Sequence, residues 1–338
     1  MRKLFQIVEE RLEAGEALVL VSITASSGAV PRGAGAHMLV GKKGRICGTI
    51  GGGAVEYRCE QIALTVLEEK VSGQREFSLN RRDVQNLGMI CGGDVKVFFH
   101  YIPAGDRDTI ALARQVETVY EAGEALWMVL NLGEGGALSL YTRQQGFFGH
   151  PCPEWLLDHL SRKPKQVEQE GYSFCTEQIN DGGRVYIFGC GHVSQELEPV
   201  LSHVGFRCVV LDDRPEFARR ELFPTAEEVC CMDFERIGES LAIGPEDYVC
   251  IMTRGHAYDT VIQAQVLPKK PCYVGVIGSR RKAAGVRKTL KEDYGLSDDL
   301  LDRVITPIGL DIEAETPEEI AVSIAAQLIR HRAELREA

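Results

Sequence analysis

A buried strand that runs straight into a glycine turn and then into a helix constrains the fold of this chain more than any other feature. The strand covers residues 185–188, the turn is Gly189-Cys190-Gly191, and the helical pattern covers residues 195–201. In such a context the first glycine permits a tight turn, the second lets the backbone approach a pyrophosphate, and the helix start offers unpaired N–H groups. The pattern is typical of a nucleotide-binding α/β domain.

The rest of the C-terminal half favours the same fold. Apolar strands at residues 185–188, 208–211, 248–252 and 273–277 alternate with helical stretches, and this rhythm predicts a doubly wound parallel sheet, a Rossmann-like fold. The first half mixes helices with short strands and is predicted to be α+β. We expect the 338 residues to divide into an N-terminal domain (1–150), a linker region (151–182) and the Rossmann-like domain (183–338).

Charge and composition exclude several classes of function. The formal net charge of −11 argues against nucleic acid as a partner, because nucleic-acid binding depends on clustered Lys and Arg. The sequence has neither a run of about 18 apolar residues nor a signal-peptide pattern, so we expect no membrane span and no secretion. Its 11 cysteines are odd in number and scattered, without a CxxC pair, which favours reduced thiols in a cytoplasmic protein.

The residues that follow the glycine turn leave the identity of a ligand open. Asp212 and Asp213 end the next strand about twenty residues on, where a carboxylate would accept hydrogen bonds from ribose hydroxyls. Arg214 could instead pair with a 2′-phosphate, so phosphorylated ligands other than NAD stay open. Ser194 occupies the third glycine position and is small enough for close helix packing. The alternative is a scaffold whose glycine turn binds nothing.

Polar loops also follow the later strands of the predicted sheet. Ligands of open α/β sheets bind at the carboxyl ends of the strands, so we expect these loops to meet the glycine turn at one crevice. Among them, Ser279-Arg280-Arg281-Lys282 suits a phosphate or pyrophosphate, or else is a helix start with solvated cations. His192 and His256 are candidate acid–base groups or ligands, although histidines at loop tips more often cap a turn. The other loops are Thr253-Arg254-Gly255-His256 and Pro307-Ile308-Gly309-Leu310-Asp311.

Glycine-rich loops also mark the N-terminal half. Gly51-Gly52-Gly53 leads into a helix that carries Glu56 in its first turn, and consecutive glycines are tolerated where a backbone or a ligand must come very close. Arg32 is the one permanently charged cation in an earlier glycine-containing loop, residues 27–38. Cys91 lies beside Gly92-Gly93, and its thiolate could ligate a soft metal or carry sulfur. It could equally be a buried turn residue, and spacing alone does not separate these two interpretations.

Together these motifs resemble the XdhC/CoxI family, the xanthine dehydrogenase accessory proteins, over nearly the whole chain. The resemblance rests on many separate stretches, so it is specific. In the N-terminal half they are Val30-Pro31-Arg32 with Gly33 and Met38, Gly48-Thr49-Ile50-Gly51-Gly52-Gly53 with Glu56, and Gly88-Met89 with Cys91-Gly92-Gly93. In the C-terminal half they are Ile187-Phe188-Gly189-Cys190-Gly191-His192-Val193, Asp212-Asp213-Arg214 with Glu216-Phe217, Thr253-Arg254-Gly255-His256, Ile277-Gly278-Ser279-Arg280-Arg281-Lys282, and Pro307-Ile308-Gly309-Leu310-Asp311 with Thr316-Pro317-Glu318-Glu319-Ile320-Ala321.

The resemblance implies a chaperone-like accessory factor rather than an enzyme with its own turnover. It implies binding of molybdenum cofactor, as molybdopterin or its dinucleotide form, sulfuration of that cofactor together with a cysteine desulfurase, and delivery to a xanthine dehydrogenase-like hydroxylase. Cys91 would be the metal ligand. A homodimer is also expected, because the exposed glycine loops would be shielded at an interface. The expected contacts are Arg32, Gly51, Gly52, Gly53, Glu56, Cys91, Gly92, Gly93, Gly189, Gly191, His192, Asp212, Asp213, Arg214, Arg254, His256, Ser279, Arg280, Arg281 and Asp311.

Two other functions compete with this interpretation. An NAD(P)-dependent oxidoreductase would use the same fold, but the sequence shows no convincing proton-transfer dyad at readable spacing. A purely structural adaptor between a desulfurase and a hydroxylase would leave the glycine loops unexplained. The chain also lacks the cysteine arrays of iron–sulfur domains, so it is not the hydroxylase itself.

Overall fold

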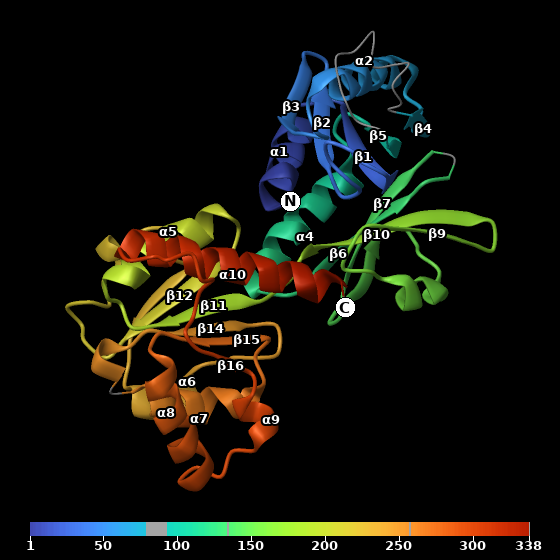
Figure 1. Ribbon diagram of the computed structural model, residues 1–338. Coiled ribbons are helices and arrows are strands. Elements are labelled where there is room, and N and C mark those ends of the chain that lie inside the picture. The colour runs from blue at the N-terminus through green and yellow to red at the C-terminus, as the bar shows by residue number, and fades with distance from the viewer. Residues whose placement is uncertain (79–92, 134, 257, 338) are drawn as a thin grey trace. The chain divides into compact units, whose positions relative to one another are not determined.

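The computed structural model describes residues 1–78, 93–133, 135–256 and 258–337. These residues form two compact units, Met1–Asp181 and Gly182–Ala338 (Figure 1). Each unit has its own sheets and its own hydrophobic core. No helix in the described part of the chain has the length and apolar character needed to span a membrane.

The first sheet of unit Met1–Asp181 is antiparallel and has five strands in the order β3-β2-β1-β5-β4. The helix α2 (Gly53–Glu69) packs on one face of this sheet through Val55, Cys59, Ala63 and Val66. The strands are β1 (Leu18–Ser27), β2 (His37–Gly41), β3 (Gly44–Gly48), β4 (Gly73–Ser78) and β5 (Asp94–Ile102).

The second sheet of this unit is also antiparallel, with the order β8-β7-β6-β10-β9. Residues 151–182, which we expected to link the domains, contribute β9 and β10 to it. Two amphipathic helices, α1 (Arg2–Glu13) and α4 (Arg107–Ala122), share one core with both sheets, so the sheets are tied into a single unit. The strands are β6 (Leu126–Asn131), β7 (Ala137–Thr142), β8 (Gly146–Gly149), β9 (Lys165–Gln169) and β10 (Tyr172–Asn180).

The unit Gly182–Ala338 is a doubly wound sheet of six parallel strands in the order β13-β12-β11-β14-β15-β16. This order confirms the Rossmann-like prediction, since the chain starts in the centre, moves to one edge and then returns to build the other half. The strands are β11 (Arg184–Phe188), β12 (Arg207–Asp212), β13 (Glu228–Cys231), β14 (Tyr248–Ile251), β15 (Tyr273–Val276) and β16 (Val304–Ile305).

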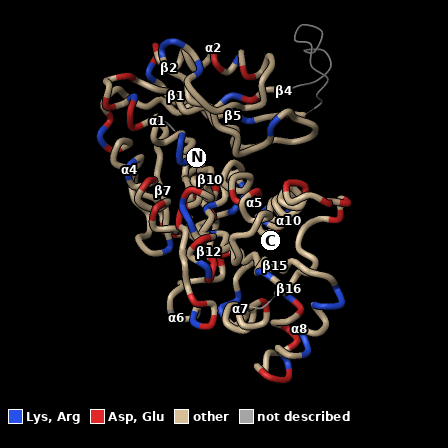
Figure 2. The backbone as a smooth tube through the Cα atoms, turned by 90° about the vertical axis from the view of Figure 1, so that its left-hand side faces the viewer, with Lys and Arg blue, Asp and Glu red and all other residues tan. Residues whose placement is uncertain are grey.

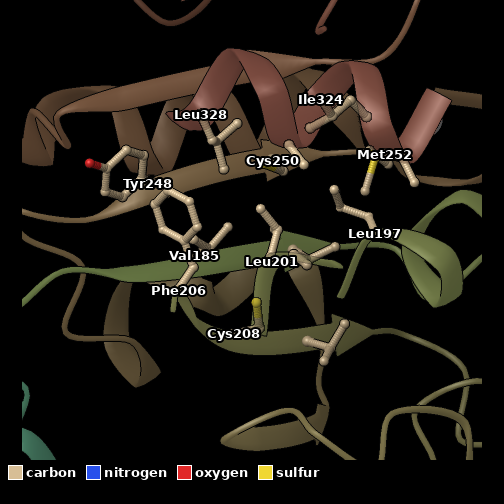
Figure 3. Packing of buried hydrophobic residues seen from close by; sticks show 14 of the residues in the cluster. Val185, Leu197, Leu201, Phe206, Cys208, Tyr248, Cys250, Met252, Ile324 and Leu328 are labelled. Atoms are coloured by element: carbon tan, nitrogen blue, oxygen red, sulfur yellow. The ribbon is translucent and has the colours of Figure 1, made fainter. Parts of the chain in front are cut away.

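Helices cover both faces of the parallel sheet. On one face, α5 (His192–His203) and α10 (Pro317–Glu337) place Leu197, Leu201, Ile324 and Leu328 over the central strands, as Figure 3 shows. The other face is covered by α6 (Ile237–Ser240), α7 (Asp259–Val266), α8 (Arg280–Glu292) and α9 (Asp298–Leu301). Because both faces are buried, the strands are apolar throughout, which is why they were readable as short apolar runs.

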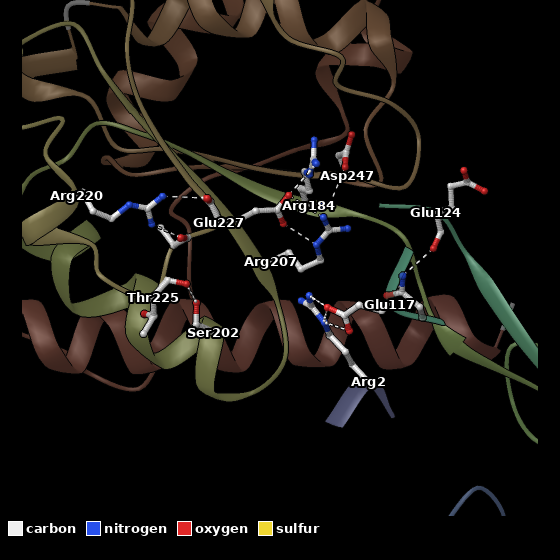
Figure 4. Close-up of polar contacts among 12 residues, drawn as sticks. Arg2, Glu117, Glu124, Arg184, Ser202, Arg207, Arg220, Thr225, Glu227 and Asp247 are labelled. Carbon is white, nitrogen blue, oxygen red and sulfur yellow. Dashed lines mark hydrogen bonds and ion pairs between the residues drawn. The ribbon is translucent and has the colours of Figure 1, made fainter. Parts of the chain in front are cut away.

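Ion pairs lie at the amino edge of this sheet, where its strands begin. Glu227 lies between Arg184 and Arg207, with nitrogen–oxygen distances of 2.8 and 2.6 Å, and Asp247 accepts a 2.7 Å hydrogen bond from the Arg184 amide (Figure 4). Figure 4 also labels the pair Arg2–Glu117, which joins α1 to α4 in the other unit. The glycine turn and the polar loops after β14 and β15 lie at the opposite, carboxyl edge of the sheet.

Candidate functional site

Glu56 organises the glycine loop at the start of α2. Its Oε2 atom accepts hydrogen bonds from the Thr49 hydroxyl (2.5 Å), the Ile50 amide (3.0 Å) and the Gly52 amide (3.1 Å). Burial by itself would raise the pKa of Glu56, but these hydrogen bonds, with the charge of Arg45, outweigh it and hold the pKa below its ordinary value. The carboxylate expected to contact a ligand therefore fixes the backbone of the loop.

A pH-dependent loss of stability is expected when Glu56 is replaced by glutamine. The pKa of Glu56 is lowered on folding, so its contribution is fully present above the unfolded pKa of about 4.5 and is lost as pH falls through the folded value. The variant should lose about 2 kcal/mol of unfolding free energy at pH 7, the order expected for hydrogen bonds to a charged group. Urea unfolding at pH 7 and pH 3.5 measures this, and an equal difference at both values would contradict it.

The structure brings the N-terminal motifs together on one loop. A Cβ atom at Gly51 would lie 2.9 Å from the Pro31 side chain and 3.2 Å from the Arg32 amide nitrogen. One at Gly93 would lie 2.2 Å from the carbonyl oxygen of Ser27. Both glycines are therefore required by close backbone approach. The segment 27–32 therefore lies against both Gly51 and Gly93, which are far from each other in the sequence.

Not every expected N-terminal contact falls in the described part of the chain. Cys91 and Gly92 lie outside the described residues. Arg32 is exposed. Gly52 and Gly53 have φ angles of 73° and 63°, and a Cβ atom at Gly52 would meet no other atom within 4 Å. The loop thus leaves open space at Gly52, although the amides of Gly51 and Gly52 already donate to Thr49 and Glu56.

The glycine turn of the second unit has one glycine that the fold requires and one that it leaves open. Gly189 has φ 101°, and a Cβ atom there would lie 2.4 Å from the Met252 carbonyl oxygen. The buried hydroxyl of Ser194 donates to the Gly189 carbonyl, which explains the serine at the third position of the motif. Gly191 begins α5 without a side-chain cap, and a Cβ atom there would enter open space. The amides of this helix start are thus available to an anion.

Asp212 makes contacts within the protein that a ribose-binding carboxylate would not. It is 1% exposed, and its two oxygens accept hydrogen bonds from the Cys190 amide (2.7 Å) and from the Arg214 guanidinium (2.8 and 3.0 Å). Burial would raise its pKa, but the bonds from Arg214 and Cys190 hold the pKa below its usual value. Arg214 in turn lies 3.9 Å from the ring centre of Phe217. Asp212, held by Arg214, therefore fixes the backbone of the glycine turn through the Cys190 amide.

Asp213 is the exposed carboxylate at this strand end. Burial and the neighbouring carboxylate of Asp212 raise its pKa. Its Oδ1 atom is 3.8 Å from the Arg214 guanidinium, a longer contact than that made by Asp212. A polar group of a ligand would therefore meet Asp213 before Asp212.

The loops after β14 and β15 lie at the same carboxyl edge. Ser279 caps α8 by accepting from the Lys282 amide, and Arg280, Arg281 and Lys282 occupy the first turn. All three cations are exposed and make no ion pair with a described residue, and Figure 2 marks the Lys and Arg of α8 in blue. Cations at a helix start oppose the helix dipole, so an anion bound there would relieve the repulsion.

The remaining expected contacts are His192, Arg254, His256 and Asp311. His192 is exposed at the first position of α5, and Arg254 is exposed after β14. Nothing is described of the His256 side chain. Asp311 is exposed, next to a segment that Gln327 holds through both the amide and the carbonyl of Gly309.

Two family models match this chain, one in each unit. A model of the XdhC Rossmann domain matches residues 185–328, and a model of the XdhC and CoxI family matches residues 11–78. The chain belongs to the XdhC and CoxI family. Residues 11–78 include Arg32, the glycine loop and Glu56, whereas Cys91 and Gly93 lie outside both matched ranges.

Relatives of this family member extend over its full length. A Bacillus subtilis (strain 168) protein, named as a probable subunit of xanthine dehydrogenase, is 27% identical over 96% of this chain and 96% of its own length. The Escherichia coli (strain K12) protein YqeB, named as uncharacterized, is 24% identical over 92% of this chain and 43% of its own. A crystal structure titled as a xanthine dehydrogenase from Bacillus halodurans superposes with a TM-score of 0.78 at 27% identity, over 98% of this chain and 96% of that one.

Most described thiols of this XdhC-family chain are unsuited to metal binding. Burial raises the pKa of Cys190 and Cys250 to about 12, so neither is a thiolate near neutral pH. Among the described residues, no group of three or more His, Cys, Asp or Glu side chains could hold a metal ion. Cys230 and Cys231 end β13 at the carboxyl edge, and they were not predicted from the sequence because no metal-ligand spacing marks them. Cys231 is exposed there.

Proposed function

We propose that this chain binds the molybdenum cofactor and supports its sulfuration and its insertion into a xanthine dehydrogenase-like hydroxylase. Its family links it to maturation of that cofactor, and a relative of nearly equal length is named as a probable subunit of xanthine dehydrogenase. In this proposal the chain is an accessory factor without turnover of its own. A cysteine desulfurase supplies the sulfur, the hydroxylase receives the cofactor, and the chain works as a homodimer.

One observation carries the proposal: the carboxyl edge of the parallel sheet fits a phosphorylated ligand. Gly191 leaves open space above the uncapped start of α5, and the cations Arg280, Arg281 and Lys282 lie at the same edge. Backbone amides at a helix start and cations are the groups that bind phosphate in proteins. A pterin phosphate that carries molybdenum would be held there by its phosphate.

Within the NAD(P) alternative, the same edge fits NADP less well than NAD. A dinucleotide would need an acidic side chain at the end of β12 for its ribose hydroxyls, or a free arginine for a 2′-phosphate. Asp212 is occupied by Cys190 and Arg214, and Arg214 is held between Asp212 and Phe217. A 2′-phosphate would have to break the contacts of Arg214, whereas ribose hydroxyls could meet the exposed Asp213.

The soft ligand of molybdenum is assigned to Cys91 from the sequence. Its neighbour Gly93 packs against the loop at residues 27–32, which also meets Gly51. When bound, the cofactor would supply the molybdenum centre that accepts the sulfur. The first unit would supply one thiol to that centre.

Replacement of Cys91 by serine tests this assignment. The change removes one soft ligand and nearly preserves volume, so we expect molybdopterin to be lost from the purified protein while its thermal stability stays unchanged. Molybdopterin and molybdenum are measured after expression in a molybdate-supplied host, together with the activity of the sulfurated hydroxylase.

The matched controls are Cys47→Ser, in β3, and Cys208→Ser, in the core of the second unit. Both should keep the cofactor. If Cys91→Ser keeps it as well, Arg32, Glu56 and the glycine backbone become the preferred contacts of the first unit. If the unaltered protein carries no molybdopterin, the proposed function is wrong.

A further inference from the structure

A cavity of about 160 Å³ lies in the second unit between α7, α8 and the carboxyl ends of β15 and β16. Its lining includes Ile277, Gly278, Ser279 and Lys282 from one of the sequence motifs, and no residue of the glycine turn. The cavity is partly open to solvent, because Ser279, Lys282 and Ala284 of its lining are exposed. Its apolar lining is supplied by Val276, Ile277, Ala283, Ala284, Val286 and Leu290.

One face of α8 forms a wall of the cavity. Ala283, Val286, Arg287 and Leu290 line the cavity with the spacing of one helix face, and Ala283 is the smallest of the four. Leucine at position 283 would fill much of the space. The second wall is formed by α7 and by Leu301 of α9.

Two buried polar side chains lie at the inner end of this otherwise apolar space. Asp259 is 2% exposed and Gln263 is 3% exposed, and both line the cavity. The Asp259 carboxylate accepts a 2.6 Å hydrogen bond from the Thr253 hydroxyl, and the Gln263 amide donates to the Asp259 carbonyl oxygen at 3.0 Å. A carboxylate has about four acceptor positions, so it can serve a ligand as well as its protein partners. Such a wall suits a ring that carries N–H or amino groups.

The rim of the cavity is basic. Ser279 and Lys282 line it, and Arg280 and Arg281 lie between them in the chain. Arg287, also on the rim, is held by Asp298 and Asp302 at 2.9 and 2.8 Å. A ligand with an apolar ring inside and an anionic group at the rim would match both parts.

We propose that this cavity binds a flat nitrogen heterocycle of the pterin or purine class, with its anionic arm directed to the first turn of α8. The inference rests on the proposed function, whose ligand it places. An apolar cavity of about 150 Å³ is known to hold a single aromatic ring, so the volume is of the right order.

The cavity also lies close enough to the glycine turn for one ligand to reach both. β14 lies between β11 and β15, so the carboxyl ends of β11 and β15 are two strand spacings, about 10 Å, apart. A ring in the cavity and phosphate at the start of α5 or α8 are therefore within reach of one molecule.

Filling the cavity with Ala283→Phe tests the inference, with pterin-6-carboxylate as the probe because it is a stable bicyclic ring with one anionic arm. Its fluorescence reports binding to the full-length chain. We expect the wild type to bind the probe and Ala283→Phe to bind it at least about tenfold more weakly, with an unchanged or raised melting temperature. Ala333→Phe, at an exposed position of α10, should bind like the wild type.

Ala283→Leu repeats the test with a smaller side chain in case the phenylalanine variant does not fold. Equal probe binding by the wild type and a folded Ala283 variant would overturn the inference, as would a wild type that does not bind the probe at millimolar concentration. Molybdopterin content separates the two proposals. Wild-type protein that purifies with molybdopterin, while a folded Ala283 variant keeps the same amount, refutes the cavity assignment and leaves the proposed function standing.

Discussion

Replacing His37 by alanine is expected to lower the free energy of unfolding of the first unit by about 3–5 kcal/mol. His37 of β2 lies between Ser22 of β1, at 2.8 Å from its hydroxyl, and Glu177 of β10, at 2.5 Å from its carboxylate. The side chains of His37 and Glu177 are only 6% and 7% exposed. Because Glu177 belongs to the second sheet, the contact ties the two sheets together, and the variant would leave a buried carboxylate without its imidazole partner.

Tryptophan fluorescence measures this loss directly, since both tryptophans, Trp127 and Trp155, belong to the first unit. Urea unfolding followed by that signal should show an earlier midpoint for His37→Ala. His150→Ala is the matched control, because His150 is an exposed histidine of the same unit, and its effect should stay within about 0.5 kcal/mol. Equal midpoints for the two variants would show that the buried contact contributes little.

Gly191→Val is expected to abolish binding of a phosphorylated ligand while the second unit stays folded. The first atom of the new side chain enters open space, so no backbone needs to move, and φ at this position is −75°, which valine accepts. The branched side chain then occupies the space through which a phosphate approaches the start of α5. Loss of affinity by at least about tenfold is expected for pyrophosphate and for molybdopterin.

The matched control for this prediction is Gly189→Ala in the same turn. There the new Cβ would lie 2.4 Å from the Met252 carbonyl oxygen at a positive φ, so stability should fall as well as binding. Calorimetric titration with pyrophosphate, alongside thermal unfolding, separates the two effects. Wild-type affinity in a folded Gly191→Val variant would mean that the turn is only a scaffold.

Residues 151–182 contain two strands that the local sequence composition did not predict. Their Pro, Lys and Glu content is typical of a linker, yet β10 pairs with β6 and places Phe174 and Cys175 in the core of the first unit. A strand whose stability comes from partners about 45 residues earlier carries little local signal, because pairing rather than propensity decides it. The Rossmann strands were readable because both of their faces are buried.

The sequence alone determined the parallel sheet, its glycine turn and the family, because these follow from short stretches whose spacing is fixed by local backbone geometry. Only the tertiary structure decided what the polar side chains contact. Asp212 and Glu56 were expected to meet a ligand, and the structure shows that within the protein they hold backbone amides and Arg214 or Thr49. The cavity beside Ala283 was also invisible in the sequence, since an empty volume depends on which side chains from distant helices face one another.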